Sequence, residues 1–202
     1  MTTPIDLVLG ALALDPEAFQ ALLGPGAAHQ RLGLTVVYLA GLSMALGQSV
    51  ALFAERVSPR RFLSTLAVQA GLFLAAFLVW ALSVWWVAGV GFDAARPLRD
   101  VIAVVGLAYA PQLFGVLILA PYLGGPLQAA LSVWTLLASL VAASAVFGLT
   151  LAQAIACAAG GWLLSQLLQR TLGRPVVRAG RRVRAWVAGI ESGTAGPPGA
   201  RR

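Results

Sequence analysis

A run of 69 residues without a charged side chain, 101–169, constrains the fold of this chain more than any other feature. About 20 apolar residues cross a bilayer as a helix, so this run has room for about three crossings. Two shorter uncharged runs, 32–54 and 62–92, precede it. The chain is 59% hydrophobic and 10% charged, with a mean hydropathy of +0.86, which excludes an ordinary soluble domain. We therefore predict an all-α, polytopic membrane protein.

Polar and turn-forming segments divide the apolar sequence into five predicted transmembrane helices. The arginine-containing connection 55–61 and the loop 91–100 separate the first three helices. Within the long run, Pro121–Pro126 is rich in turn residues and Gly148 is a weaker break. We expect a five-helix bundle in a membrane domain over 32–172, with spans at 32–54, 62–90, 101–120, 126–147 and 150–172.

The first 31 residues predict two short amphipathic helices at the membrane interface. Thr3 and Asp15 each precede a proline, the pattern that begins a helix. A transmembrane helix here would bury Asp15 and Glu17 without partners, at a cost of a few kcal/mol each. A water-facing pair of helices packed against the spans is an equally good interpretation.

The end of the chain concentrates positive charge, because eight of the fourteen basic residues lie beyond residue 169. Over 173–190 the pattern predicts a basic amphipathic helix that lies on the anionic cytoplasmic leaflet; a solvated arginine run is the alternative. The composition of 191–202 is typical of a disordered tail. The predicted membrane-surface residues are Arg174, Arg178, Arg181, Arg182, Arg184 and Trp186.

The distribution of charge predicts the orientation in the membrane. With five crossings, the loop 55–61 and the basic tail lie on the same side, which the positive-inside rule places in the cytoplasm. The N-terminus then faces outward. All basic residues are arginine, and lysine and asparagine are absent, as in GC-rich bacterial sequences. We expect a bacterial inner-membrane protein that binds no nucleic acid.

Residues suited to catalysis or metal binding are scarce. The predicted spans contain no Asp, Glu, Lys, Arg or His, so a proton or ion pump is not expected. One histidine, His29, and one cysteine, Cys157, exclude a haem held by two histidines, a zinc site of three such ligands and an internal disulfide. We expect no catalytic residue, no metal, no cofactor and no enzyme activity.

Small residues recur every fourth position in two predicted spans, and in a shorter run at Ala138 and Ala142 of the fourth, a pattern that lets helices approach closely. The second span carries Ala67, Gly71 and Ala75, and the fifth carries Ala152, Ala156 and Gly160. These positions predict helix packing within the bundle or, alternatively, a docking face for another membrane protein. Six glutamines can hydrogen-bond between helices: Gln48, Gln69, Gln112, Gln128, Gln153 and Gln166.

The third span contains Gly106, Tyr109 and Pro111, and the proline predicts a kink, because the Leu107 carbonyl loses its helical partner. Such a kink beside a tyrosine either shapes the bundle or holds a lipid or cofactor.

Three segments together resemble Yip1-domain membrane proteins over about residues 10–172. They are 15–19 (Asp-Pro-Glu-Ala-Phe), 106–111 (Gly-Leu-Ala-Tyr-Ala-Pro) and 119–124 (Leu-Ala-Pro-Tyr-Leu-Gly, which contains Pro121), followed by Trp134. The resemblance implies a five-helix membrane domain. Eukaryotic members act in vesicle traffic and contact Rab GTPases. This chain lacks their acidic Asp-Leu-Tyr-Gly-Pro segment and has the opposite predicted orientation, so the Rab-linked role is not expected here.

These observations predict a non-enzymatic scaffold, assembly factor or accessory subunit whose partner is another integral membrane protein. The alternative is a small transporter, channel or lipid-handling protein with its path near Tyr109, Pro111 and the glutamines.

Overall fold

A computed structural model describes residues 3–23, 27–48, 59–120 and 122–167, which form helices joined by turns, with no β-strand among them. The predicted all-α class is confirmed. The elements in chain order are α1 (Pro4–Leu12), α2 (Pro16–Gln20), η1 (Ala21–Leu23), α3 (Ala27–Gly47), α5 (Pro59–Phe92), α6 (Leu98–Leu107), η2 (Ala110–Leu119), α7 (Gly124–Phe147) and a last helix, Leu151–Leu167.

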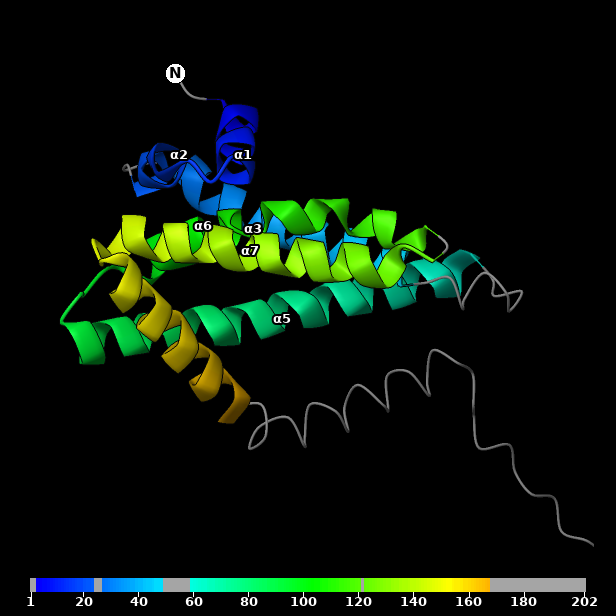
Figure 1. Cartoon of the computed structure of the whole chain (residues 1–202). Helices are drawn as coiled ribbons and strands as arrows, with labels where there is room; N and C mark the ends of the chain where they lie inside the picture. The colour runs from blue at the N-terminus through cyan, green and yellow to red at the C-terminus, as the bar shows by residue number, and fades with distance from the viewer. Residues whose placement is uncertain (1–2, 24–26, 49–58, 121, 168–202) are drawn as a thin grey trace, which may run out of the picture.

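The long helices run alternately in opposite directions (Figure 1). The end of α5, the start of α6 and the end of α7 lie at one end of the bundle. The end of η2 and the start of α7 lie at the other end, and the last helix leaves the bundle at a steep angle. Such alternation is typical of neighbouring helices joined by short connections.

Two helices, α5 over Phe62–Phe92 and α7, are long and apolar enough to cross a membrane. The pair α6 and η2, bent by 40°, is a third if it counts as one span. The helices Arg31–Gly47 and Leu151–Leu167 are apolar but shorter than a full crossing in the described part of the chain. These helices are consistent with a membrane protein, and the five crossings stay a prediction.

The observed helices lie close to the predicted spans. The helix α5 extends the predicted 62–90 by a few residues at each end, and α7 begins two residues before 126. Gly148 ends α7 with a φ of 66°, a left-handed conformation that glycine adopts easily, as the predicted break requires. Two helices, α6 and η2, occupy the predicted third span, 101–120, and the chain is interrupted between them.

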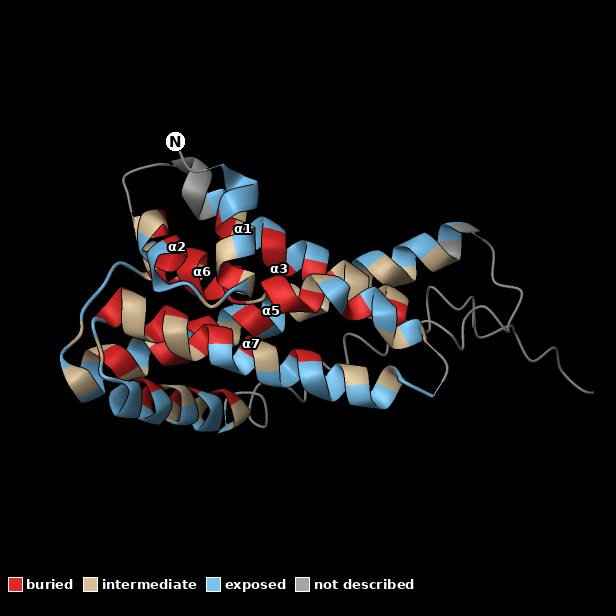
Figure 2. Cartoon of the chain, turned by 45° about the horizontal axis from the view of Figure 1, so that its top comes forward, coloured by how far each residue is buried: buried red, intermediate tan, exposed pale blue. Residues whose placement is uncertain are grey.

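The centre of the bundle is α6, whose residues 103–107 are all buried. It packs against α3, α5 and α7, and against η1. The apolar part of the helix, 101–107, requires such surroundings. Figure 2 shows that burial is greatest near α6 and decreases toward the far end of the bundle, where α7 begins.

The two N-terminal helices begin as predicted. Thr3 and Asp6 form a capping box at α1, and Asp15 caps α2 through the Glu17 N–H at 2.9 Å. The hydrogen bonds from Thr3, its side chain first and its backbone second, hold the pKa of Asp6 below its ordinary value of 3.8.

The same helices pack against the bundle. Phe19 and Leu22 are fully buried, and the Trp134 indole of α7 donates to the Leu12 carbonyl at 3.0 Å. This packing is the one expected if the pair lies against the spans.

Candidate functional site

The break between α6 and η2 brings together three residues of the predicted signature. The helix α6 ends at Leu107, and η2 begins at Ala110 after a bend of 40°. The Tyr109 N–H donates to the Gly106 carbonyl at 3.1 Å, which is a tighter turn than an α-helix. Pro111 has no backbone N–H and so cannot continue the hydrogen bonds of the helix. The predicted kink is confirmed, whereas Pro121 lies outside the described residues.

Aromatic side chains of α5 surround Tyr109 at this break. Its ring contacts those of Phe77, Phe73 and Trp80 edge to face, at centroid distances of 5.2, 5.8 and 6.2 Å. Such pairs contribute about 0.5–1.5 kcal/mol each beyond their buried area. The rings fill the space beside the kink, and therefore Tyr109 fastens the break to α5.

Ser43 of α3 supplies hydrogen bonds that the irregular backbone of η2 lacks. Its hydroxyl donates to the Leu113 carbonyl at 2.7 Å and accepts from the Val116 N–H at 2.9 Å. In an apolar environment an unpartnered backbone group costs several kcal/mol. One side chain of α3 thus satisfies two backbone groups of η2.

A second polar contact joins η2 to α7. The Gln112 amide donates to the Thr135 hydroxyl at 3.1 Å, and Thr135 donates to the Leu131 carbonyl at 2.8 Å. Gln112 is one of the glutamines expected to link helices, and this link is present. Its Oε1 atom is buried and has no hydrogen-bond partner in the described part of the chain.

The other glutamines have different surroundings. Gln153 bonds Thr150 at the start of the last helix, through the Thr150 N–H at 3.0 Å, and so caps that helix instead of joining two. Gln128 is exposed on α7, and Gln166 is partly buried. Gln48 and Gln69 line one cavity between α3 and α5.

Two of the three predicted small-residue stripes lie on exposed faces, whereas Ala138 and Ala142 of α7 are fully buried in the bundle. On α5, Ala67, Gly71 and Ala75 are all exposed, and a Cβ atom placed on Gly71 would meet no atom within 4 Å. In the last helix, Ala152 and Ala156 are exposed as well. Of the six positions in these two stripes, Gly160 lies against a neighbouring helix, because a Cβ atom placed on it would lie 3.2 Å from the Val87 side chain of α5.

The close packing inside the chain uses other small residues, which the sequence reasoning missed. A Cβ on Gly33 of α3 would lie 2.2 Å from the Ala103 carbonyl oxygen, and one on Gly106 would lie 2.8 Å from the Gly33 backbone. Further along, a Cβ on Gly47 would lie 2.1 Å from the Gly115 carbonyl oxygen. The glycines of α3 are visible in the sequence, but Gly33 and Gly47 do not form a stripe with a period of four.

Charged side chains contribute little to this region. The described residues contain one ion pair, between the adjacent Arg99 and Asp100 at 3.5 Å, and no group of three or more His, Cys, Asp or Glu that could hold a metal. The six predicted membrane-surface residues, Arg174 to Trp186, lie outside the described residues, as do the tail and the loop before α5.

A comparison of the chain with family models, with curated proteins and with solved structures finds no match. The Yip1-like assignment consequently depends on the residues quoted from the sequence.

Proposed function

We propose that the protein is a non-enzymatic, Yip1-like membrane protein that serves as a scaffold, assembly factor or accessory subunit of a larger membrane complex. In this proposal it crosses the bacterial inner membrane five times, with its C-terminus in the cytoplasm. The basic tail rests on the anionic leaflet. The exposed face of α5 binds a transmembrane helix of the partner.

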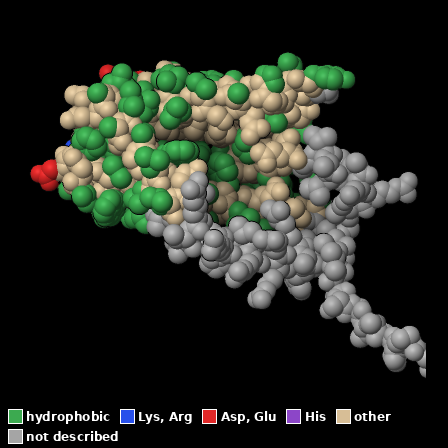
Figure 3. All heavy atoms as spheres, turned by 60° about the horizontal axis from the view of Figure 1, so that its bottom comes forward, with side chains coloured by type: hydrophobic (Ala, Val, Ile, Leu, Met, Phe, Trp, Pro, Cys, Tyr) green, Lys and Arg blue, Asp and Glu red, His purple; other side chains and the backbone are tan. Residues whose placement is uncertain are grey.

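The observation that carries this proposal is the exposed stripe of Ala67, Gly71 and Ala75 on α5, the less covered of the two helices that are long enough to cross a membrane. In the most apolar window of α5, 11% of the residues are buried inside the protein, compared with 44% for α7. On the side of the molecule turned forward in Figure 3, hydrophobic side chains are spread among backbone and uncharged polar atoms, and acidic groups lie at the edge. In lipid the hydrophobic effect does not drive helices together, so they associate through close packing. Small residues at every fourth position allow this packing, especially with a helix that carries small residues itself.

Of the alternatives, a small transporter or channel is supported less well than a lipid-handling protein. A transport path near Tyr109 and Pro111 needs a hydrated cavity at the break, but aromatic rings of α5 occupy that space. Pro111 is itself fully buried. We therefore favour a role in which the core of the bundle supports a docking face.

The test is Gly71→Leu, which places a branched side chain in the stripe without a clash inside the protein. A photoreactive residue at position 75 should crosslink the partner in native membranes, and Gly71→Leu should lower that yield about tenfold. Gly91→Leu is the matched control, because Gly91 is also exposed on α5 with no atom within 4 Å of its Cβ. Equal crosslinking in both variants, or no crosslink from the parent chain, would overturn the proposal.

A further inference from the structure

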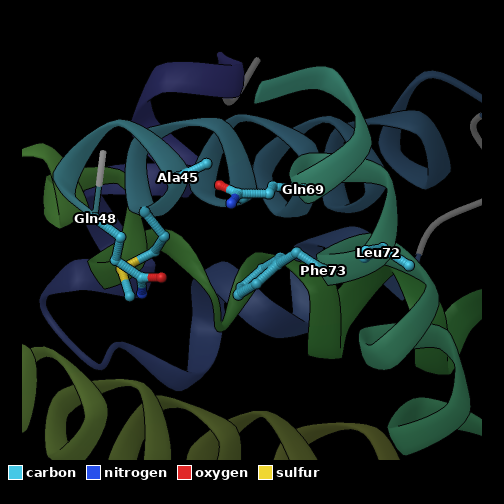
Figure 4. A pocket seen from close by; sticks show the side chains of 7 residues that line it. Ala45, Gln48, Gln69, Leu72 and Phe73 are labelled. Carbon is cyan, nitrogen blue, oxygen red and sulfur yellow. The ribbon is translucent and has the colours of Figure 1, made fainter. Parts of the chain in front are cut away.

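A cavity of about 340 Å³ lies between α3 and α5 (Figure 4). Its lining is mixed, with two amides, two aliphatic or thioether side chains, one aromatic ring and two small residues. The lining residues are Gly41, Met44, Ala45, Gln48, Gln69, Leu72 and Phe73. Ligand cavities in proteins begin at about 300 Å³, so this one has room for a polar group and a short length of chain.

The polar groups of the cavity come from two helices. Gln48 follows the end of α3 and Gln69 projects from α5, and Figure 4 shows both side chains at the cavity. Gln48 is exposed and Gln69 is half-buried, so both side-chain amides are accessible to a ligand, and none of the lining residues is charged. An amide facing hydrocarbon without a partner costs free energy, which a hydrogen-bonding ligand offsets.

The apolar wall of the cavity is held in place from behind. Phe73 lines the cavity and also contacts the ring of Tyr109 at 5.8 Å, edge to face. A Cβ on Gly41 would lie 3.0 Å from the Phe73 ring, so α3 closes on the same side chain. The ring therefore has little freedom to turn into the cavity and fill it.

We infer that this cavity binds a neutral membrane lipid, whose hydroxyl or ester group hydrogen-bonds Gln48 and Gln69 while its chain lies along Phe73. Amides both donate and accept hydrogen bonds, as an uncharged hydroxyl or ester requires. A phosphate would bring negative charge to a lining without a cation, so acidic lipids should be excluded.

This inference does not depend on the docking face proposed above. A helix turns about 100° per residue, which places Gln69 and Phe73 on the side of α5 opposite to Gly71. The variant at Gln69 therefore tests the cavity and the variant at Gly71 tests the docking face. If one proposal is wrong, only its own variant lacks the expected effect.

The experiment uses the full chain in nanodiscs with two photoreactive probes of identical acyl chains, a diacylglycerol and a phosphatidic acid. We expect the diacylglycerol probe to label residues 41–48 and 69–73, located by mass spectrometry, and the phosphatidic acid probe to label them much less. Gln69→Leu removes one hydrogen-bonding group at nearly constant volume and should lower the diacylglycerol labelling about fivefold. Leu72→Trp, which fills the cavity, should abolish it.

Gln128→Leu is the matched control, since it makes the same change on an exposed site of α7. Equal labelling by the two probes, or equal labelling of Gln69→Leu and the parent chain, would overturn the inference. Reaction of Gln69→Cys with a membrane-impermeant maleimide would overturn it too, because the cavity would then hold water.

Discussion

Two glycines, Gly33 of α3 and Gly106 of α6, determine how closely the central helix approaches its neighbour. A side chain at either position would place its Cβ atom within 3 Å of backbone atoms of the other helix. Backbone cannot move aside as the end of a flexible side chain can. The contact is therefore available only to glycine at both positions.

Gly33→Ala should destabilise the protein by about 1–3 kcal/mol, the usual cost of overpacking, even though alanine favours helix by about 1 kcal/mol over glycine. Thermal unfolding in mild detergent measures this change as a lower Tm. Gly125→Ala is the control, because a Cβ there meets no atom within 4 Å. A Gly33→Ala protein with the Tm of the parent chain would show that the two helices are not in this contact.

The sequence pattern found small residues but not their partners. The period of four selected Ala67, Gly71 and Ala75 correctly as one face of a helix, and the structure places that face outside the bundle. The pairing of Gly33 with Gly106 depends on which helices become neighbours. No local spacing encodes that choice.

Among the elements, η2 departs furthest from the expectation for a transmembrane helix. It runs for 10 residues as a 3₁₀ helix, whereas such helices seldom exceed three or four residues. Pro111 predicts where the regular helix stops, and this was visible in the sequence. That the chain continues as a 3₁₀ helix was not predictable, because its backbone depends on Ser43 of another element.

Ser43→Ala should cost about 2–4 kcal/mol, because it leaves a carbonyl and an N–H of η2 without their partner. The measurement is the free energy of unfolding in detergent, with hydrogen exchange of residues 110–119 as a local readout. Ser132→Ala is the control, because Ser132 is exposed on α7 and its hydroxyl bonds the Gln128 carbonyl of the same helix. This change should alter the free energy of unfolding by less than about 0.5 kcal/mol. Similar losses in both variants would contradict the special role of Ser43.

At the scale of the whole molecule, the long helices alternate in direction, and the predicted membrane topology stays a prediction. The start of α5 and its end lie at opposite ends of the bundle (Figure 1). The end of α7 at residue 147 and the start of the last helix at residue 151, next to the predicted 150, followed from turn residues alone.

Labelling of single cysteines in a Cys157→Ser background tests this topology. Cys157 is buried and its thiol contacts the Val84 carbonyl, which serine can also bond. Asp93→Cys, beyond α5, should react with an impermeant maleimide from outside intact cells. Arg60→Cys, at the start of α5, should react only after the cells are permeabilised. Both parent side chains are exposed. Reaction of both from one side would show that α5 does not cross, and the reverse result would invert the proposed orientation.

The central position of α6 has a consequence for how the protein is made. Domains and segments nearer the N-terminus leave the ribosome first. The helices α3 and α5 are thus synthesised before α6, yet much of the packing surface of α3 is supplied by α6 and η2. Until those residues arrive, the early helices have only each other and lipid as neighbours. Biogenesis should accordingly reach a compact, protease-resistant state only after η2 has left the insertion machinery.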